Sequence, residues 1–125
     1  MLLVFLVGVG GFLGAVSRYL LGGWVHDVLR SPWWPYGTFA VNIVGCLLIG
    51  FFVGIGDGRN ALSAQSRAFI LVGFLGGFTT FSAFGYETFA LMRQGQMLGA
   101  LANVSAQVIL GLVAVWAGYA IAQVV

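Results

Sequence analysis

The sequence predicts an all-α membrane protein with four transmembrane helices and a break in the third. Its 125 residues are 61% apolar and only 6% charged, whereas an average soluble domain is about 25% charged. Four long apolar stretches alternate with short charged segments, and a spanning helix needs about 20 mostly apolar residues. The third stretch holds consecutive glycines and threonines near its middle, where they disfavour a regular helix.

This composition excludes several other classes of protein. A disordered chain is poor in apolar residues, and a disulfide scaffold needs paired cysteines, whereas Cys46 stands alone. The net charge of +2 comes from scattered residues, and they do not form the basic stripe of a nucleic-acid-binding protein. A β-barrel reads as short alternating segments, unlike these continuous runs. An integral helical membrane protein therefore remains.

We expect a single membrane domain over residues 1–125, with helices at about 2–23, 36–56, 67–92 and 97–123. Almost all of the charged residues lie between these helices. The first stretch has no basic region beyond the amino terminus, so we expect a retained spanning helix rather than a cleaved signal peptide.

The segment before the second predicted helix contains Pro32, Trp33, Trp34 and Pro35. Proline is tolerated at the start of a helix, and tryptophan prefers the boundary between membrane and water. We therefore expect the second helix to begin at the membrane surface, at about residue 36.

The arginines give almost no preference for one orientation in the membrane. Arg30 and Arg93 lie on one side, with Arg18 near the end of its helix as a third candidate, and Arg59 and Arg67 lie on the side of both termini. The positive-inside rule compares such counts. Either other determinants fix the topology, or the protein inserts both ways and pairs antiparallel.

Glycine is unusually frequent, with 20 residues against an average of about 7%. Four pairs have small-xxx-small spacing: Gly10/Gly14, Gly50/Gly54, Gly73/Gly77 and Gly95/Gly99. Small residues let helix backbones approach closely in lipid, so we expect most of these glycines to pack helices. Four short helices can hardly enclose a pathway alone, so a transport function implies a homo-oligomer.

Polar side chains within the spans are candidates for function. Thr38 and Asn42 share a face of the second helix, and Asn103 and Gln107 share a face of the fourth. Asn103 and Gln107 are as well explained by hydrogen bonding between helices, whereas we expect Asn42 to face a cavity. Arg18 either reaches the membrane surface or gives a positive potential to an aqueous vestibule.

Glu87 is the one acidic residue with apolar sequence on both sides. A proton-coupled exporter needs such a carboxylate as its proton site. Arg93 is close in sequence, so Glu87 is equally well explained as a residue near a helix end.

The segment from Gly76 to Phe84 predicts the break in the third helix. Broken helices in membranes are tolerated where they are buried in protein or line a cavity, and they often hold ions. Freed carbonyl groups suit a cation such as Na⁺, and freed N–H groups suit an anion. Phe81 and Phe84 are three residues apart, and a ring edge carries positive potential that attracts an anion. Ordinary packing is the other interpretation of these two rings.

Three motifs in this order resemble the Fluc (CrcB) family of small fluoride channels, over essentially the whole chain. The first is Gly10-Gly11-Phe12-Leu13-Gly14-Ala15 with Arg18-Tyr19, and the second is Gly37-Thr38 with Val41-Asn42 and Gly45. The third and most specific is Gly73-Phe74-Leu75-Gly76-Gly77-Phe78-Thr79-Thr80-Phe81-Ser82 with Phe84. Glu87 also lies where the family usually has an acid.

The resemblance implies a dual-topology antiparallel homodimer with two fluoride pores in the plasma (inner) membrane. It implies a central structural Na⁺ bound by the main-chain carbonyls of Gly76 and Thr79 from each subunit. It also implies passive export of fluoride from the cytoplasm, where entry of HF accumulates it. The implied fluoride pathway contains ring edges, a donating amide, nearby hydroxyls and a vestibule cation: Phe81, Phe84, Asn42, Ser82, Thr38 and Arg18.

One feature departs from the family. Its members often have a track of hydroxyl side chains along the fourth helix, whereas this sequence offers Asn103, Gln107 and Gly111 there. Amides still donate hydrogen bonds to fluoride, so we expect an altered track in which Asn103 takes part.

Two other function classes stay open at the level of sequence. A small proton-coupled exporter of lipophilic cations needs a carboxylate deep in the first helix, and residues 1–23 contain none. An accessory subunit without a pathway predicts that changes at Asn42 or Phe81 affect assembly only. An enzyme is least favoured, because the spans hold no combination of His, acid and nucleophile, and His26 is interpreted as a loop residue.

Overall fold

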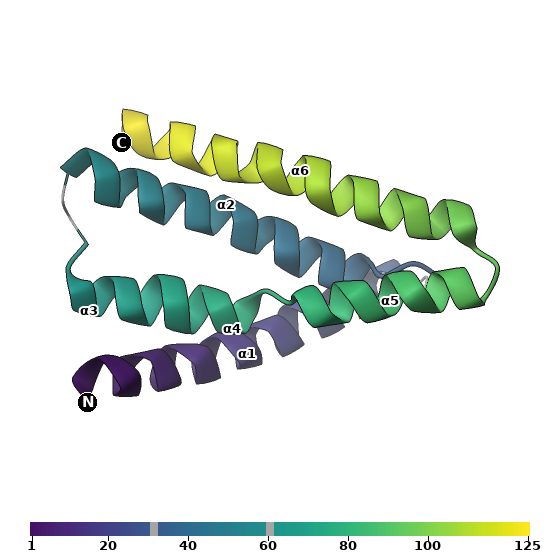
Figure 1. Ribbon diagram of the computed structural model, residues 1–125, viewed down its shortest axis with the longest axis horizontal. Helices are drawn as coiled ribbons and strands as arrows, with labels where there is room; N and C mark the ends of the chain where they lie inside the picture. Colours follow the sequence, from purple (N-terminus) through teal and green to yellow (C-terminus); the bar gives the residue numbers. More distant parts are fainter. Residues whose placement is uncertain (31–32, 60–61) are drawn as a thin grey trace.

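A computed structural model of the chain describes residues 1–30, 33–59 and 62–125. Four helices in it are long and apolar enough to cross a membrane, which confirms the four predicted spans. They are α1 (Leu2–Leu29), α2 (Tyr36–Arg59), an interrupted third span (Ala64–Arg93) and α6 (Met97–Val124). The chain passes back and forth, so both termini lie at the same end of the molecule (Figure 1).

Helix α1 is longer than predicted, since it ends at Leu29 rather than at residue 23. Polar residues such as His26 and Asp27 end the apolar pattern without interrupting backbone hydrogen bonding, and Arg30 closes the helix in a left-handed conformation (φ 47°). Arg18 therefore lies well inside α1, which corrects its predicted place near the helix end. Helix α2 begins at Tyr36, as predicted, whereas Pro32 lies outside the described residues.

The third span consists of α3 (Ala64–Arg67), η1 (Ala68–Leu75), α4 (Gly76–Phe78) and α5 (Phe81–Arg93). The predicted break is confirmed and is confined to two extended residues, Thr79 (φ −86°, ψ 160°) and Thr80 (φ −150°, ψ 116°). Gly76 and Gly77 stay helical. The wider π-helical turns of η1 were not predicted, because the apolar run over 68–75 has no feature that distinguishes them from α-helix.

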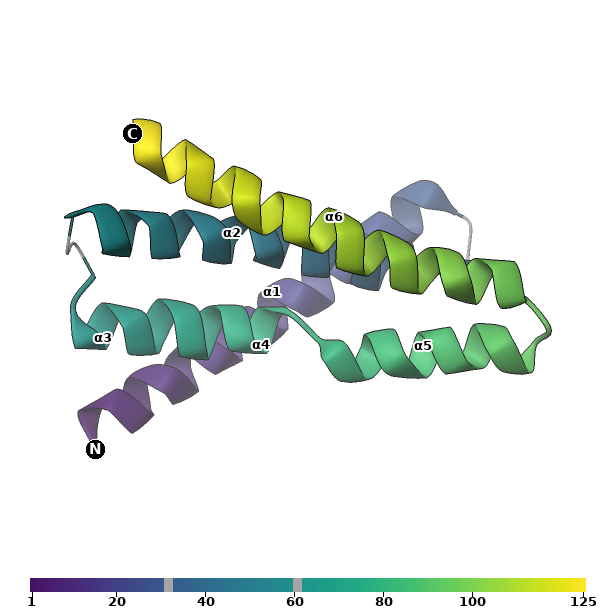
Figure 2. The ribbon, with the colours of Figure 1, turned by 45° about the horizontal axis from the view of Figure 1, so that its top comes forward.

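Most of the predicted glycine pairs bring helix backbones into contact. Helix α1 crosses obliquely against η1 and α4 (Figure 2). A Cβ atom added at Gly14 would overlap the Phe74 carbonyl oxygen, and one at Gly77 would lie 2.5 Å from the Gly11 carbonyl oxygen. Helix α2 packs along α6, where a Cβ atom at Gly50 would overlap the Val115 carbonyl oxygen. Such close approach is how small residues stabilise helix pairs in lipid.

The pair Gly95/Gly99 was interpreted wrongly. Gly95 lies in the turn between α5 and α6 with a positive φ of 75°, and an added Cβ atom there would meet nothing within 4 Å. A conformation with positive φ favours glycine for steric reasons. Gly95 therefore allows the chain to reverse and does not pack a helix.

Candidate functional site

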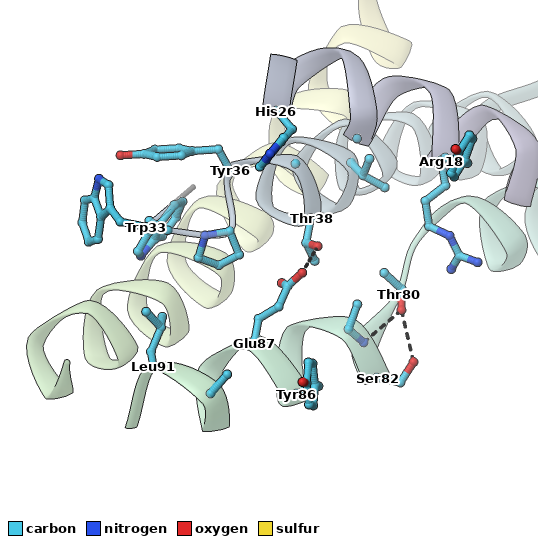
Figure 3. A pocket seen from close by; sticks show the side chains of 18 of the residues that line it. Arg18, His26, Trp33, Tyr36, Thr38, Thr80, Ser82, Tyr86, Glu87 and Leu91 are labelled. Atoms are coloured by element: carbon cyan, nitrogen blue, oxygen red, sulfur yellow. Dashed lines mark hydrogen bonds between the residues drawn. The ribbon is translucent and has the colours of Figure 1, made fainter. Parts of the chain in front are cut away.

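The break lies between two cavities. The first, which we call the vestibule, has a volume of about 710 Å³ and is lined by α1, the start of α2 and α5, including Arg18, Thr38 and Glu87 (Figure 3). The second, which we call the aromatic cavity, has a volume of about 400 Å³ and is lined by residues that include Phe81, Phe84 and Gln107. Thr80 lines both cavities.

Asn42 of α2 binds the broken backbone at Thr80. The Thr80 N–H donates to Asn42 Oδ1 at 2.9 Å, and Asn42 Nδ2 donates to the Thr80 carbonyl at 3.2 Å. In an unbroken helix that N–H would donate to the carbonyl of Gly76. The Asn42 oxygen therefore takes the place of the helical acceptor for the Thr80 N–H, which membrane burial requires.

A chain of hydrogen bonds continues from Asn42 into α6 and α5. Asn42 Nδ2 donates to Gln107 Oε1 at 2.7 Å, Gln107 Nε2 donates to Asn103 Oδ1 at 3.0 Å, and Asn103 Nδ2 donates to Thr88 Oγ1 at 2.9 Å. The Thr88 hydroxyl donates to the Phe84 carbonyl at 2.8 Å. Asn103 is 0% exposed, so its position fits the alternative interpretation of an amide that joins helices.

The vestibule combines one cation, one acid and several hydroxyl groups. Arg18 Nη1 donates to the Thr79 carbonyl at 3.3 Å, so the guanidinium reaches the break itself. The Thr38 hydroxyl donates to Glu87 Oε1 at 2.6 Å, as Figure 3 shows, and the buried Glu87 Oε2 has no hydrogen-bond partner within the part of the chain that the structure describes. The hydroxyls of Thr80 and Ser82 lie 3.2 Å apart at the start of α5.

Phe81 and Phe84 lie together at the aromatic cavity. Their ring centroids are 5.5 Å apart and the rings are tilted by 51°, as expected for residues one turn apart on a helix. Phe81 is 82% exposed, so one side of the cavity is open in the single chain.

A metal ion at this site would have to rely on backbone oxygens. No group of three His, Cys, Asp or Glu residues among those described could hold a metal. Gly76 and Thr79 both line the aromatic cavity, and the Gly76 carbonyl has lost its helical N–H donor to Asn42. These two carbonyls fit a hard cation, which prefers oxygen ligands. The Thr79 carbonyl also accepts a hydrogen bond from Arg18, which leaves one of its two lone pairs for a cation.

The structure thus brings the sequence-predicted residues into one region around the break. Thr38, Arg18 and Ser82 line the vestibule, while Asn42, Phe81, Phe84, Gly76 and Thr79 line the aromatic cavity. Asn103 lines neither cavity, and hydrogen bonds to Gln107 and Thr88 link it to the aromatic cavity.

Sequence reasoning missed three connections at the site. The link between Thr38 and Glu87 could have been found, because they are a polar pair within otherwise apolar spans. Thr88 gave no signal, since one threonine in a helix is ordinary. The bond from Asn42 to Gln107 joins residues 65 positions apart, so no local spacing predicts it.

Comparisons with known proteins agree with these motifs. A family model described as CrcB-like protein, Camphor Resistance (CrcB), matches residues 5–119. A Geotalea daltonii protein named fluoride-specific ion channel FluC is 46% identical over 120 residues, covering 96% of each chain. Proteins of the same name from Flavobacterium psychrophilum and Rhizobium etli are each 42% identical, covering 96% and 97% of this chain and 96% of each relative.

Proposed function

The chain belongs to the CrcB family, and from this premise we propose that it is a fluoride-selective channel that passively exports fluoride from the cytoplasm. Its four apolar helices make it a multi-pass membrane protein. We place it in the plasma (inner) membrane, where a passive pathway lets fluoride that entered as HF leave the cell as the anion.

The observation that carries this proposal is the pair of cavities that flank Thr80 at the break in the third span. A channel must replace the hydration shell of an ion with fixed groups while binding it weakly enough for release. Fluoride is small and strongly hydrated, so its pathway needs hydrogen-bond donors and positive ring edges at close range. The break places hydrogen-bonding groups within the membrane span, and Phe81 and Phe84 follow it directly in α5.

We assign the two cavities to successive parts of the pathway. In the vestibule, Arg18 contributes positive potential, and Thr38 and Ser82 provide hydroxyl groups. In the aromatic cavity, Phe81 and Phe84 present ring edges to the dehydrated ion. Asn42 lines the aromatic cavity and binds Thr80, which lines both cavities, and Asn103 supports the pathway from behind.

The functional unit in this proposal is an antiparallel homodimer of dual topology. Two observations support it. Phe81 is 82% exposed, so the aromatic cavity needs a second wall to exclude lipid, and a second copy of the chain supplies one. The arginines are almost evenly divided between the two sides of the membrane, which is compatible with insertion in both orientations.

We further propose that a structural Na⁺ is bound at the dimer centre by the carbonyls of Gly76 and Thr79 from both subunits. The freed Gly76 carbonyl supports this site, and the Thr79 carbonyl keeps one lone pair beside its hydrogen bond from Arg18. The ion would satisfy carbonyl groups that otherwise face an apolar environment, and its charge would favour nearby anions.

Reconstitution tests the proposal. Purified protein in liposomes loaded with potassium fluoride or potassium chloride should release fluoride rapidly once a potassium ionophore is added, as followed with ion-selective electrodes, while chloride release stays at the level of protein-free vesicles. Fluoride release no faster than from protein-free vesicles, or equal release of both halides, contradicts a fluoride-selective channel.

A further inference from the structure

Arg18 brings a positive charge to the break that no acid neutralises. A charged side chain within a membrane span is costly, and it usually pairs with an opposite charge or with backbone carbonyls. The acid of the vestibule, Glu87, accepts from the Thr38 hydroxyl at Oε1, and its Oε2 has no partner among the described residues. The Arg18 guanidinium instead donates to the Thr79 carbonyl at 3.3 Å, at the side of the vestibule where Figure 3 shows Thr80. A carbonyl has no net charge, so the full charge of Arg18 remains.

The Thr79 carbonyl belongs to both sides of the break. Arg18, its donor, lines the vestibule, whereas Thr79 itself lines the aromatic cavity together with Gly76. The Gly76 carbonyl has lost its helical donor, because the Thr80 N–H donates to Asn42. These two carbonyls are the oxygens of the proposed Na⁺ site. A cation bound there and the guanidinium would therefore occupy the two lone pairs of one oxygen atom.

Two positive charges on one oxygen atom repel each other. Unit charges a few ångströms apart interact by more than thermal energy even at an effective dielectric constant of about 20, and salt screens such partly buried charges poorly. The second lone pair of Thr79 leaves room for the cation. The charge of Arg18 nevertheless lowers the affinity for it below the affinity that the carbonyls alone would give.

An anion in the vestibule changes this balance. Arg18 lines the vestibule, so an anion beside the guanidinium offsets its positive charge. The repulsion between Arg18 and the cation then weakens, and the cation binds more tightly. Because such coupling is reciprocal, the bound cation raises the affinity for the anion by the same factor.

We propose that Arg18 sets the affinity of the cation site through the Thr79 carbonyl, so that the cation binds tightly only when an anion occupies the vestibule. Arg18 is a positioning residue here, since it acts on the cation through an oxygen atom that both contact. The proposal rests on the proposed Na⁺ site and fluoride pathway. It adds a link between them that makes occupancy of one depend on the other.

The test measures Na⁺ binding to the purified full chain in detergent micelles, without any flux. A ligand that binds only the folded protein raises its thermal midpoint, so the dependence of the midpoint on Na⁺ concentration gives a dissociation constant. Ionic strength is kept constant with N-methylglucamine fluoride or N-methylglucamine gluconate. Three variants are compared with wild type. Arg18→Met removes the charge, Arg18→Lys keeps it, and Arg30→Met removes a charge from an exposed residue that lines neither cavity.

In gluconate, Arg18→Met should bind Na⁺ at least about tenfold more tightly than wild type, because the repulsion between like charges is gone. Wild type should bind Na⁺ more tightly in fluoride than in gluconate, and this difference should shrink in Arg18→Met. Arg18→Lys and Arg30→Met should stay near wild type in both salts. A structural role of the Arg18 hydrogen bond predicts the opposite, weaker Na⁺ binding in Arg18→Met.

An unchanged or weaker Na⁺ affinity in Arg18→Met therefore overturns the proposal, as does an equal effect of fluoride in Arg18→Met and wild type. If Arg18→Met does not yield folded protein, wild type alone decides, because the same dissociation constant in fluoride and gluconate contradicts the coupling. The absence of any Na⁺ effect in wild type overturns the proposed cation site and this inference together. Coupled binding in a protein that releases no fluoride from liposomes contradicts the channel function alone.

Discussion

The two halves of the third span are held in place by different means. Before the break, η1 and α4 pack against α1 through glycines, with backbone against backbone at Gly14 and Gly77. After the break, α5 is bound by polar side chains: Thr38 of α2 donates to Glu87, and Asn103 of α6 donates to Thr88. A single chain segment therefore changes from steric packing to hydrogen bonding within two residues.

This difference indicates that the segment before the break has a structural role and that the segment after it carries the pathway. Backbone contact through glycine leaves no room for an ion and fixes the position of the segment before the break. Polar contacts leave cavities and offer groups that an ion can use, so the segment after the break carries the proposed pathway. Changes to the packing glycines before the break should therefore affect folding, and changes to the residues that line the cavities after it should affect conduction.

The largest effect is expected from Gly14→Val. Any Cβ atom at this position overlaps the Phe74 carbonyl oxygen, so α1 cannot approach the third span, and such overpacking costs about 1–3 kcal/mol or more. We expect little monodisperse protein in size-exclusion chromatography. Gly8→Val is the matched control on the same helix, because an added Cβ atom there meets nothing within 4 Å. Equal yields of the two variants would contradict the importance of this contact.

The next effect is expected after the break, from Phe81→Ile. The side chain is 82% exposed in the single chain, so folding should be unaffected, whereas loss of the ring edge should abolish or greatly slow fluoride efflux from liposomes. Phe89→Ile is the control on the same helix, since Phe89 is 56% exposed and lines neither cavity. Normal efflux through Phe81→Ile would remove this ring from the mechanism.

The break itself can be displaced by Gly45→Ala. The added Cβ atom would overlap Cγ2 of Thr79, while its next contacts are at 3.5 Å or more, so the methyl group of Thr79 alone causes the conflict. We expect about tenfold slower efflux, equivalent to ~1.4 kcal/mol. Thr79→Ser removes that methyl and keeps the hydroxyl that donates to Leu75. The double variant should therefore recover wild-type efflux, and a double variant as slow as Gly45→Ala would contradict this explanation.

The smallest effect is expected from Thr88→Val, at the far end of the hydrogen-bond chain. The substitution removes the acceptor for Asn103 and the donor to the Phe84 carbonyl. Hydrogen bonds between membrane helices contribute about 0.6 kcal/mol on average, so we expect a slightly lower thermal midpoint and unchanged fluoride efflux. A loss of efflux comparable to that of Phe81→Ile would show that this chain of hydrogen bonds does more than join the helices.

The sequence predicted those parts of the fold that depend on local pattern. The spans follow from apolar runs, and the break follows from Gly76, Gly77, Thr79 and Thr80, although only the threonines leave the helix. The end of α1 was missed because His26 and Asp27 end an apolar pattern without ending a helix. At the break, the residue types and the backbone hydrogen bonding change at the same place. At the end of α1, the apolar pattern stops before the helical hydrogen bonding does.

The residues of the candidate site could be predicted from the sequence, but the hydrogen bonds between them could not. Asn42, Phe81 and Phe84 are unusual enough in a membrane span to be selected from sequence. However, one of the two Asn42 amide hydrogens is donated to Gln107 of α6, which lies 65 positions further along the chain, while the other is donated to the Thr80 carbonyl. Which polar group is free to meet an ion follows only from the complete set of hydrogen bonds, because each partner removes one donor from the site.

The most direct measurement of the proposed function is the dependence of fluoride efflux on membrane potential. Liposomes are loaded with potassium fluoride, and efflux is recorded before and after addition of a potassium ionophore. A passive channel that moves the anion alone builds up a potential that stops its own flux, so efflux should begin only with the ionophore and should not depend on a pH gradient. Efflux that proceeds without the ionophore and follows an imposed pH gradient would contradict a passive channel and favour proton-coupled export.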